Sequence, residues 1–252
     1  LTLRAAYIPR ENAKGTIICM HGYHSTNDIE FVPEVRFLWN LGYSILLPWQ
    51  RSHGKSEGRY ITYGVKERHD LKRWILYTNR HLAAKNKDIF LCGISMGCAT
   101  TLMAAGLDLP DNVKGIIADC GFTSPWDIIK HVAKERFHLP PFPLMYMVDL
   151  ISEVVAGFGL KEVSIPEIMK RNKIPVLFIH GDADDYVPMW MTIKNYEACA
   201  AKKELYIVSG AGHALAFSKD MEEGKRRIKN FINKYKTCLL YTSPSPRDRS
   251  LS

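Results

Sequence analysis

The stretch that decides the fold is Asp88-Ile-Phe-Leu-Cys-Gly-Ile-Ser-Met-Gly97, in which an apolar run leads into a Gly-x-Ser-x-Gly pattern centred on Ser95. The run predicts a buried strand over 88–92, and the residues that follow predict a helix over 95–105. A sharp turn between strand and helix forces the central serine into strained backbone angles and leaves its hydroxyl exposed for reaction. The helix N-terminus brings free N–H groups and partial positive charge to the same place. Ser95 is therefore the first candidate nucleophile.

On both sides of this stretch, apolar runs of strand length alternate with amphipathic segments of helix length. Strands are predicted at 16–20, 43–47, 88–92, 113–118, 176–179 and 204–208, and helices at 31–41, 65–83, 95–105 and 221–235. Continuous apolar strands separated by helices indicate a parallel sheet that is buried on both faces. We therefore predict an α/β fold with a mostly parallel, doubly wound sheet. The chain starts inside a strand-like segment, which predicts that the first strands of the fold are truncated.

One segment, at about 122–171, interrupts the alternation and contains no clear strand. Two helical pieces are predicted there, at 127–137 and 144–157. The segment is interpreted as a cap-like insertion within a single domain (1–236), lying over the carboxyl edge of the sheet, where open α/β sheets bind ligands. Large apolar residues follow one another in the insertion at helical spacing: Trp126, Phe137, Phe142, Met145, Tyr146 and Met147. They have two interpretations, core packing or the lining of an acyl or aryl pocket.

The two ends of the chain are unusual. The chain begins at Leu1 without a methionine, so a preceding signal or anchor is compatible with the sequence. Residues 237–252 are rich in Ser, Pro and Arg and have no periodicity. This tail resembles translated sequencing-adapter read-through at the ends of metagenomic gene fragments, and the alternative is a native disordered tail.

Composition narrows the class of protein. The net charge of +8 is interleaved with acids and is accompanied by no nucleic-acid-binding motif, so we expect no nucleic-acid partner. No apolar run approaches the ~20 residues of a membrane helix. The six cysteines form no C-x-x-C pair; Cys19, Cys92 and Cys120 fall in strand-like runs, which predicts reduced core thiols and a cytoplasmic location.

No cofactor is expected from the sequence. The chain contains no G-x-G-x-x-G pattern, which argues against a dinucleotide. His21 and His24 resemble a pair of metal ligands, but no acidic or thiol ligand accompanies them, so no metal site is predicted.

A serine nucleophile needs a base, and the base needs an acid to orient it. Downstream of Ser95, a predicted strand ends in a loop with three carboxylates, Asp182, Asp184 and Asp185. After the next strand, a loop of small residues carries His213. This order of serine, acid and histidine, each directly after a strand, matches the order that α/β-hydrolases use.

These motifs resemble the α/β-hydrolase superfamily, and most closely its bacterial esterase and peptidase-like members related to prolyl oligopeptidases and S33 aminopeptidases. The resemblance runs from about Leu3 to Lys236 and includes Gly-Ile-Ser-Met-Gly, His-Gly-Asp-Ala-Asp-Asp-Tyr-Val-Pro and Gly-Ala-Gly-His, together with Arg51–Gly58 and Tyr63–Asp70. It implies Ser95, Asp184 and His213 as the catalytic triad, because Asp184 alone of the three carboxylates matches the acid of the family pattern.

The same resemblance implies an oxyanion hole. Met20-His-Gly-Tyr23 is similar to the His-Gly-x segment of the family, so the backbone N–H groups of Tyr23 and Met96 are the implied donors. One residue departs from the pattern, since Trp49 stands where the subgroup usually has Asp. Trp49 is outside the triad, so the departure concerns the local loop rather than the chemistry.

The expected activity is hydrolysis of short- to medium-chain carboxylic esters through an acyl-enzyme. Peptide or amide cleavage on the same triad is the nearest alternative, because the resembling subgroup includes peptidases. The substrate partner is accordingly a small ester or a short peptide. A non-catalytic binding module on the same fold is an alternative of a different class, and the intact triad argues against it.

Overall fold

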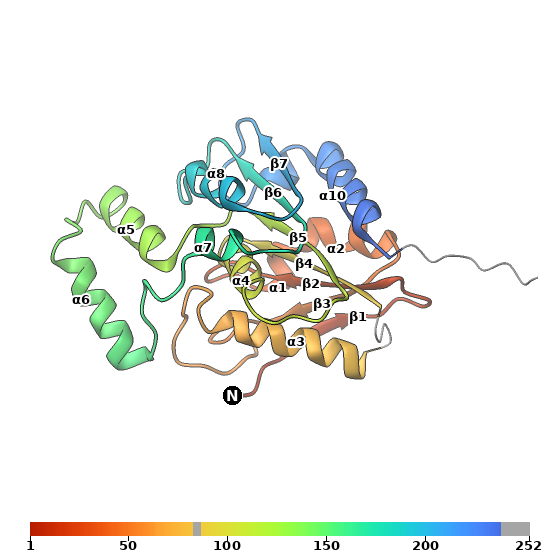
Figure 1. The fold of residues 1–252 in the computed structure, drawn as a ribbon, viewed down its shortest axis with the longest axis horizontal. Helices are drawn as coiled ribbons and strands as arrows, with labels where there is room; N and C mark the ends of the chain where they lie inside the picture. The colour runs from red at the N-terminus through yellow and green to blue at the C-terminus, as the bar shows by residue number, and fades with distance from the viewer. Residues whose placement is uncertain (83–86, 238–252) are drawn as a thin grey trace, which may run out of the picture.

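The computed structural model describes residues 1–82 and 87–237, so the predicted tail from Cys238 onward lies outside the described residues. Figure 1 shows a central sheet with helices on both faces. The strands are β1 (Ala5–Ile8), β2 (Gly15–Met20), β3 (Ser44–Pro48), β4 (Asp88–Ile94), β5 (Val113–Asp119), β6 (Val176–Gly181) and β7 (Lys203–Val208). The helices are α1 (Asn27–Glu30), α2 (Val32–Asn40), α3 (Glu67–His81), α4 (Met96–Ala104), α5 (Pro125–Glu135), α6 (Leu144–Ile151), the π-helical turn η1 (Ser152–Ala156), α7 (Ile165–Met169), α8 (Met189–Ala198), α9 (Ala216–Lys219) and α10 (Met221–Tyr235).

The seven strands form one sheet in the order β1-β3-β2-β4-β5-β6-β7. All neighbouring pairs are parallel except β1 and β3, which are antiparallel. The order reverses at β2, so helices cover both faces of the sheet, with α3, α4, α7 and α8 on one face and α2, α9 and α10 on the other. The predicted mostly parallel, doubly wound α/β fold is confirmed.

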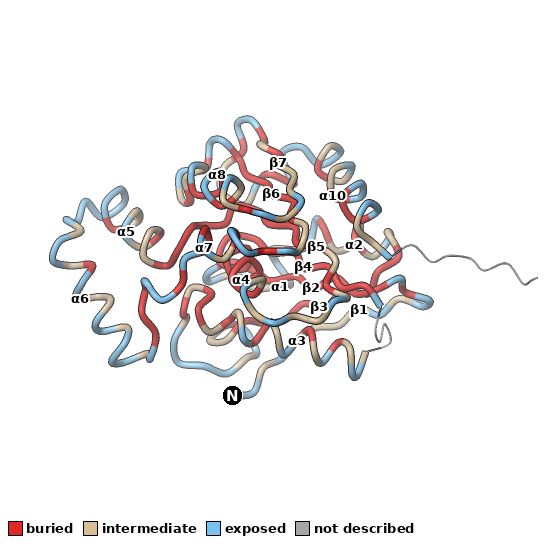
Figure 2. The backbone as a smooth tube through the Cα atoms, viewed as in Figure 1, coloured by how far each residue is buried: buried red, intermediate tan, exposed pale blue. Residues whose placement is uncertain are grey.

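Two hydrophobic cores flank the sheet, because consecutive side chains of a strand point to opposite faces. In β2, Ile18 and Met20 pack with α3, α4, α7 and α8, whereas Ile17 and Cys19 pack with α2, α9 and α10. Figure 2 shows the central strands buried along most of their length. This double burial explains why the strands appear in the sequence as continuous apolar runs.

The insertion forms a cap that projects beyond the carboxyl ends of the strands (Figure 1). It consists of α5, α6 and η1, and most of it is exposed or half-buried (Figure 2). Of the apolar residues singled out from the sequence, Met145 is buried and Trp126 is half-buried. The others are exposed: Phe137, Phe142, Tyr146 and Met147. Core packing therefore accounts for Met145 but not for these four side chains.

The described part of the chain contains no helix of the length and apolar character that a membrane span requires. Cys19, Cys92, Cys98, Cys120 and Cys199 are buried free thiols, as predicted for the three cysteines in strand-like runs. Trp49, the residue that departs from the family pattern, is buried, and its backbone N–H donates to the Arg4 carbonyl over 3.0 Å. The loop that follows β3 is thus held in place with tryptophan at this position.

Candidate active site

Ser95 lies between β4 and α4, at a turn that the local glycines make possible. Its backbone angles are φ 54° and ψ −116°, a left-handed region that non-glycine residues rarely occupy. A side chain on Gly97 would come within 1.8 Å of the Met20 carbonyl oxygen, so the helix packs against β2 only with glycine there. The turn therefore holds Ser95 at the first turn of α4, on the carboxyl edge of the sheet.

The structure brings Ser95, His213 and Asp184 together from three separate loops. His213 Nε2 lies 2.9 Å from Ser95 Oγ, and His213 Nδ1 lies 2.7 Å from Asp184 Oδ2. An ionised carboxylate can only accept, so Nδ1 of His213 carries the proton and Nε2 is free to accept the serine proton. The arrangement is the nucleophile, base and orienting acid that acyl transfer needs.

Asp184 is fixed by more contacts than its two acidic neighbours. Its Oδ1 accepts the backbone N–H groups of Tyr186 and Val187, each over 2.9 Å. Asp182 instead accepts the Gly210 N–H, and Asp185 is exposed and pairs with Arg136. Of the three carboxylates considered from the sequence, only Asp184 contacts His213.

A second histidine supports Asp184. His180 Nε2 lies 3.2 Å from Asp184 Oδ2 and 2.8 Å from the Val187 carbonyl oxygen, which makes Nε2 the protonated nitrogen. Burial alone would raise the pKa of Asp184, but hydrogen bonds from His180, His213 and the backbone outweigh it and hold the pKa well below its ordinary value. Asp184 is therefore ionised at neutral pH.

The loop after β2 passes beside Ser95. His21 is buried, and its Nε2 accepts the Gln50 N–H over 3.0 Å while its Nδ1 lies 2.8 Å from the Gly22 carbonyl oxygen. His21 is therefore engaged through both ring nitrogens, which leaves it unsuited to ligate a metal. Tyr23 follows Gly22 in this loop, and Met96 begins α4 directly after Ser95.

Three carboxyl groups lie behind and beside the nucleophile: Glu30 at the end of α1, Glu34 in α2 and Asp119 at the end of β5. Burial raises the pKa of Glu34 to about 8, of Asp119 to about 7 and of Glu30 to about 6. Glu34 Oε2 and Asp119 Oδ1 have no hydrogen-bond partner among the described residues. Repulsion from Glu30 adds to the raised pKa of Glu34 and of Asp119, so Glu34 favours its protonated form at neutral pH, whereas Glu30, with a pKa of about 6, is mostly ionised there.

One group of possible metal-binding side chains occurs within the described ranges, formed by Cys120, Asp184 and His213. Their ligand atoms lie within 4.8 Å of one another. Asp184 and His213 already bond to each other, and burial raises the pKa of the Cys120 thiol well above its usual range. Because zinc binds thiolate rather than thiol, this set favours the triad over a metal centre.

Aromatic rings lie beside His213 and in the loop after β2. Tyr186 lies 5.1 Å from the ring of His213, and Tyr23 stacks on Tyr63 at 5.3 Å. From the cap, Arg136 lies 4.8 Å over the ring of Tyr186. The tyrosines thus place apolar rings with polar hydroxyl groups near His213. Ser95 itself is only 5% exposed.

Several of these residues were not predicted from the sequence. Glu30, Glu34 and Asp119 carry no motif that distinguishes them from surface or capping residues, and His180 begins the His-Gly-Asp-Ala-Asp-Asp-Tyr-Val-Pro motif but was given no role. The one usable signal was position, since Asp119 and His180 directly follow the predicted strands 113–118 and 176–179, at the edge where Ser95 lies. The acids of α1 and α2 approach the site only through packing, which sequence patterns do not record.

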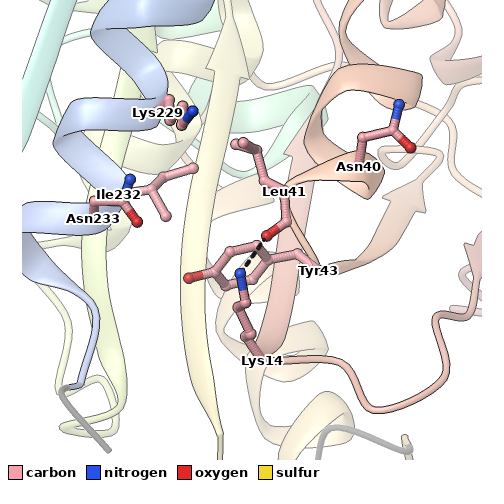
Figure 3. A pocket seen from close by; sticks show the side chains of 7 residues that line it. All are labelled: Lys14, Asn40, Leu41, Tyr43, Lys229, Ile232 and Asn233. Atoms are coloured by element: carbon pink, nitrogen blue, oxygen red, sulfur yellow. Dashed lines mark hydrogen bonds between the residues drawn. The ribbon is translucent and has the colours of Figure 1, made fainter.

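A separate pocket of about 230 Å³ lies away from these residues (Figure 3). Its lining comes from the region before β2 and β3 and from α10: Lys14, Asn40, Leu41, Tyr43, Lys229, Ile232 and Asn233. Lys14 and Tyr43 directly precede their strands, so this pocket is at the amino edge of the sheet. The triad follows the strands, so it occupies the opposite edge.

The sheet order and the serine at the turn between β4 and α4 are those of α/β-hydrolases. The protein is a hydrolase of the α/β-hydrolase superfamily. More narrowly, the chain belongs to the prolyl oligopeptidase family, which it matches over residues 56–237. The resemblance inferred from the sequence motifs is confirmed at this level.

The chain is also similar to individual proteins. YqkD of Bacillus subtilis is 28% identical over 231 residues, which cover 92% of this chain and 75% of YqkD. A solved structure of the Pyrococcus furiosus esterase Pf2001 is 25% identical with a TM-score of 0.72, and 93% of each chain is covered. A monoacylglycerol lipase from Paleococcus ferrophilus shares the fold at 20% identity, with a TM-score of 0.67 and 94% and 100% of the two chains covered.

Proposed function

We propose that the protein hydrolyses carboxylic esters through an acyl-enzyme on Ser95, with His213 as general base and Asp184 as the acid that orients it. The observation that carries the proposal is the continuous hydrogen-bonded series from Ser95 Oγ to His213 and from His213 to Asp184, at 2.9 and 2.7 Å. These distances lie within the range over which a base removes a proton from its nucleophile.

In the first half-reaction, Ser95 Oγ attacks the carbonyl carbon and its proton passes to His213 Nε2. The carbonyl oxygen becomes an oxyanion, which accepts hydrogen bonds from the N–H groups of Tyr23 and Met96. When the tetrahedral intermediate collapses, the alcohol leaves with the proton from His213, and the acyl group stays on Ser95. Ionised Asp184 stabilises the imidazolium that forms in between.

The second half-reaction reverses these roles with water in place of the alcohol. His213 removes a proton from water as the water oxygen attacks the acyl carbon. The proton then returns to Ser95 Oγ as the carboxylic acid leaves, so the enzyme is regenerated without a cofactor.

Two observations bear on the substrate. The solved structures of similar fold include an esterase at 25% identity, which favours oxygen esters. Membership of the prolyl oligopeptidase family favours cleavage of short peptides or aminoacyl amides by the same triad, and this is the second candidate. The exposed aromatic and apolar side chains of the cap support an apolar acyl or aryl group in either case.

The test compares the wild type with Ser95→Ala and with Ser209→Ala, a matched change at an exposed serine. Each is assayed on p-nitrophenyl esters of increasing acyl length and on aminoacyl p-nitroanilides. We expect ester turnover that Ser95→Ala abolishes and Ser209→Ala leaves unchanged. Faster turnover of the anilides would favour the peptidase alternative, and ester hydrolysis that persists in Ser95→Ala would overturn the proposal.

A further inference from the structure

Glu30 is a half-buried carboxyl group that contacts the backbone beside the nucleophile. It ends α1, and its Oε2 accepts the backbone N–H of Gly22. It also accepts a hydrogen bond from the Ser25 side chain. A Cβ atom added to Gly22 would lie 2.9 Å from Glu30 Oε1 and 3.4 Å from Ser95 Cβ. Glu30 and Ser95 therefore approach the same glycine, which has no side chain to separate them.

Gly22 joins two peptide groups, of which the second carries the Tyr23 N–H proposed to bind the oxyanion. The peptide before it carries the Gly22 N–H, which Glu30 accepts. The peptide after it carries the Gly22 carbonyl, which faces His21 Nδ1 at 2.8 Å, and the N–H of Tyr23. Because a peptide group is planar and trans, fixing its carbonyl oxygen also fixes the direction of its N–H. His21 thus orients the Tyr23 N–H from one side of Gly22.

A glycine between two peptide groups leaves its own φ and ψ unrestrained by a side chain. Holding the second peptide is therefore insufficient unless the first is held as well. On the first peptide, Gln50 bonds to the His21 carbonyl and Glu30 to the Gly22 N–H. Of these two restraints on the first peptide, only the one from Glu30 comes from an ionisable side chain.

We propose that Glu30 is a positioning residue for acyl transfer: by holding the Gly22 N–H it aims the Tyr23 N–H at the oxyanion that forms on Ser95. This inference rests on the function proposed above. Its effect falls on the transition state, because the oxyanion does not exist in the bound substrate. Loss of Glu30 should therefore lower kcat and leave KM nearly unchanged.

The same contact makes the positioning sensitive to pH. The pKa of Glu30 is raised to about 6 by burial, against the opposing effects of the Gly22 N–H, His213 and Ser25. The other titratable groups near it are His213, whose charge favours ionised Glu30, and Glu34 on α2 and Asp119 on β5, whose pKa values Glu30 itself raises. As the pH falls through about 6, Glu30 gains a proton and becomes a weaker acceptor for the Gly22 N–H. Protonation of Glu30 therefore contributes to the loss of activity on the acid side.

The experiment compares Glu30→Ala and Glu30→Gln with the wild type, with Glu222→Gln as a control at an exposed glutamate on α10, which should match the wild type. The substrate is a p-nitrophenyl ester, assayed from about pH 5 to about pH 9, on either side of the Glu30 transition. We expect Glu30→Ala to lower kcat about 10- to 100-fold with KM changed less than about threefold, a smaller loss than removal of an oxyanion donor itself. Glu30→Gln keeps an acceptor oxygen, so at about pH 8 it should restore kcat to within about fivefold of wild type and give a shallower acid limb.

Two results would overturn the inference while leaving the proposed function intact: wild-type kcat in Glu30→Ala, or an acid limb in Glu30→Gln that superimposes on that of the wild type. If Glu30→Ala does not fold, as judged by its melting curve, the pH profile of Glu30→Gln decides alone. Failure of the proposed function is distinguishable, because the wild type itself would then hydrolyse neither esters nor anilides.

Discussion

Replacing Asp184 by asparagine isolates what the carboxylate does for His213. Oδ1 of Asp184 accepts two backbone N–H groups, so the amide oxygen of the substituted side chain will take that position. The amide NH₂ then faces His213 Nδ1, where Oδ2 stood at 2.7 Å. The opposite orientation would set the NH₂ against both backbone donors, which is worse than its single unfavourable approach to His180 at 3.2 Å.

With a donor facing Nδ1, the neutral imidazole of His213 must carry its proton on Nε2. That nitrogen lies 2.9 Å from Ser95 Oγ and can no longer accept the serine proton. The same tautomer error in a serine protease triad costs about 10⁴-fold in kcat, equivalent to about 5 kcal/mol of transition-state stabilisation. We expect a loss of this size in Asp184→Asn, with substrate binding largely retained.

The assay is steady-state hydrolysis of a short-chain p-nitrophenyl ester, with melting curves to show that the variant is folded. Asp182→Asn and Asp185→Asn are the controls, because neither side chain contacts His213, and both should stay within about threefold of wild type. A loss of less than about tenfold in folded Asp184→Asn would refute the reasoning. A larger loss at Asp182 than at Asp184 would show that the acid has been wrongly assigned.

Three further predictions concern stability. The pKa of Glu34 is raised from 4.5 to about 8 in the folded state, so between these values the folded protein binds more protons than the unfolded chain. The free energy of unfolding should therefore fall as the pH rises from 4.5 to 8. In Glu34→Gln, urea titrations should show this fall reduced by on the order of 4 kcal/mol, and an unchanged pH dependence would count against the burial of the Glu34 carboxyl. Ser95→Gly should relieve the backbone strain at φ 54° and raise the melting temperature by about 2–4 °C while activity is lost; a lower melting temperature would contradict the strain. Asp70→Ala removes the two hydrogen bonds of 2.7 and 2.8 Å from Arg51 and should lower the free energy of unfolding by about 3 kcal/mol in urea, whereas a loss below about 1 kcal/mol would mean that solvent replaces the pair.

The sheet could be predicted from the sequence because its signals are local. Strands buried on both faces must be apolar throughout, so β2, β4 and β6 each appear as an unbroken run. The helices α1, α7, α8 and α9 were not predicted; α1 and α9 span only four residues each, and α7 spans five. A short helix of this kind is fixed by tertiary packing rather than by its own periodicity.

Some residues of the candidate site could also be predicted from local signals, and others could not. Ser95, Asp184 and His213 each follow a strand in a recognisable motif, and parallel strands end at a common edge, so their proximity could be inferred. Glu30 could not, because nothing in its sequence neighbourhood indicates that α1 folds back on Gly22. Its contact depends on the three-dimensional path of the loop after β2, which no period or motif encodes.

The central claim is that Ser95 is a nucleophile activated by His213, and covalent labelling tests it most directly. The protein is incubated with a fluorophosphonate and its intact mass is measured, followed by peptide mapping. We predict one adduct per chain, located on the peptide that contains Ser95, absent from Ser95→Ala and formed much more slowly in His213→Ala. A folded wild type that takes up no label, or one labelled equally in Ser95→Ala, would contradict the claim.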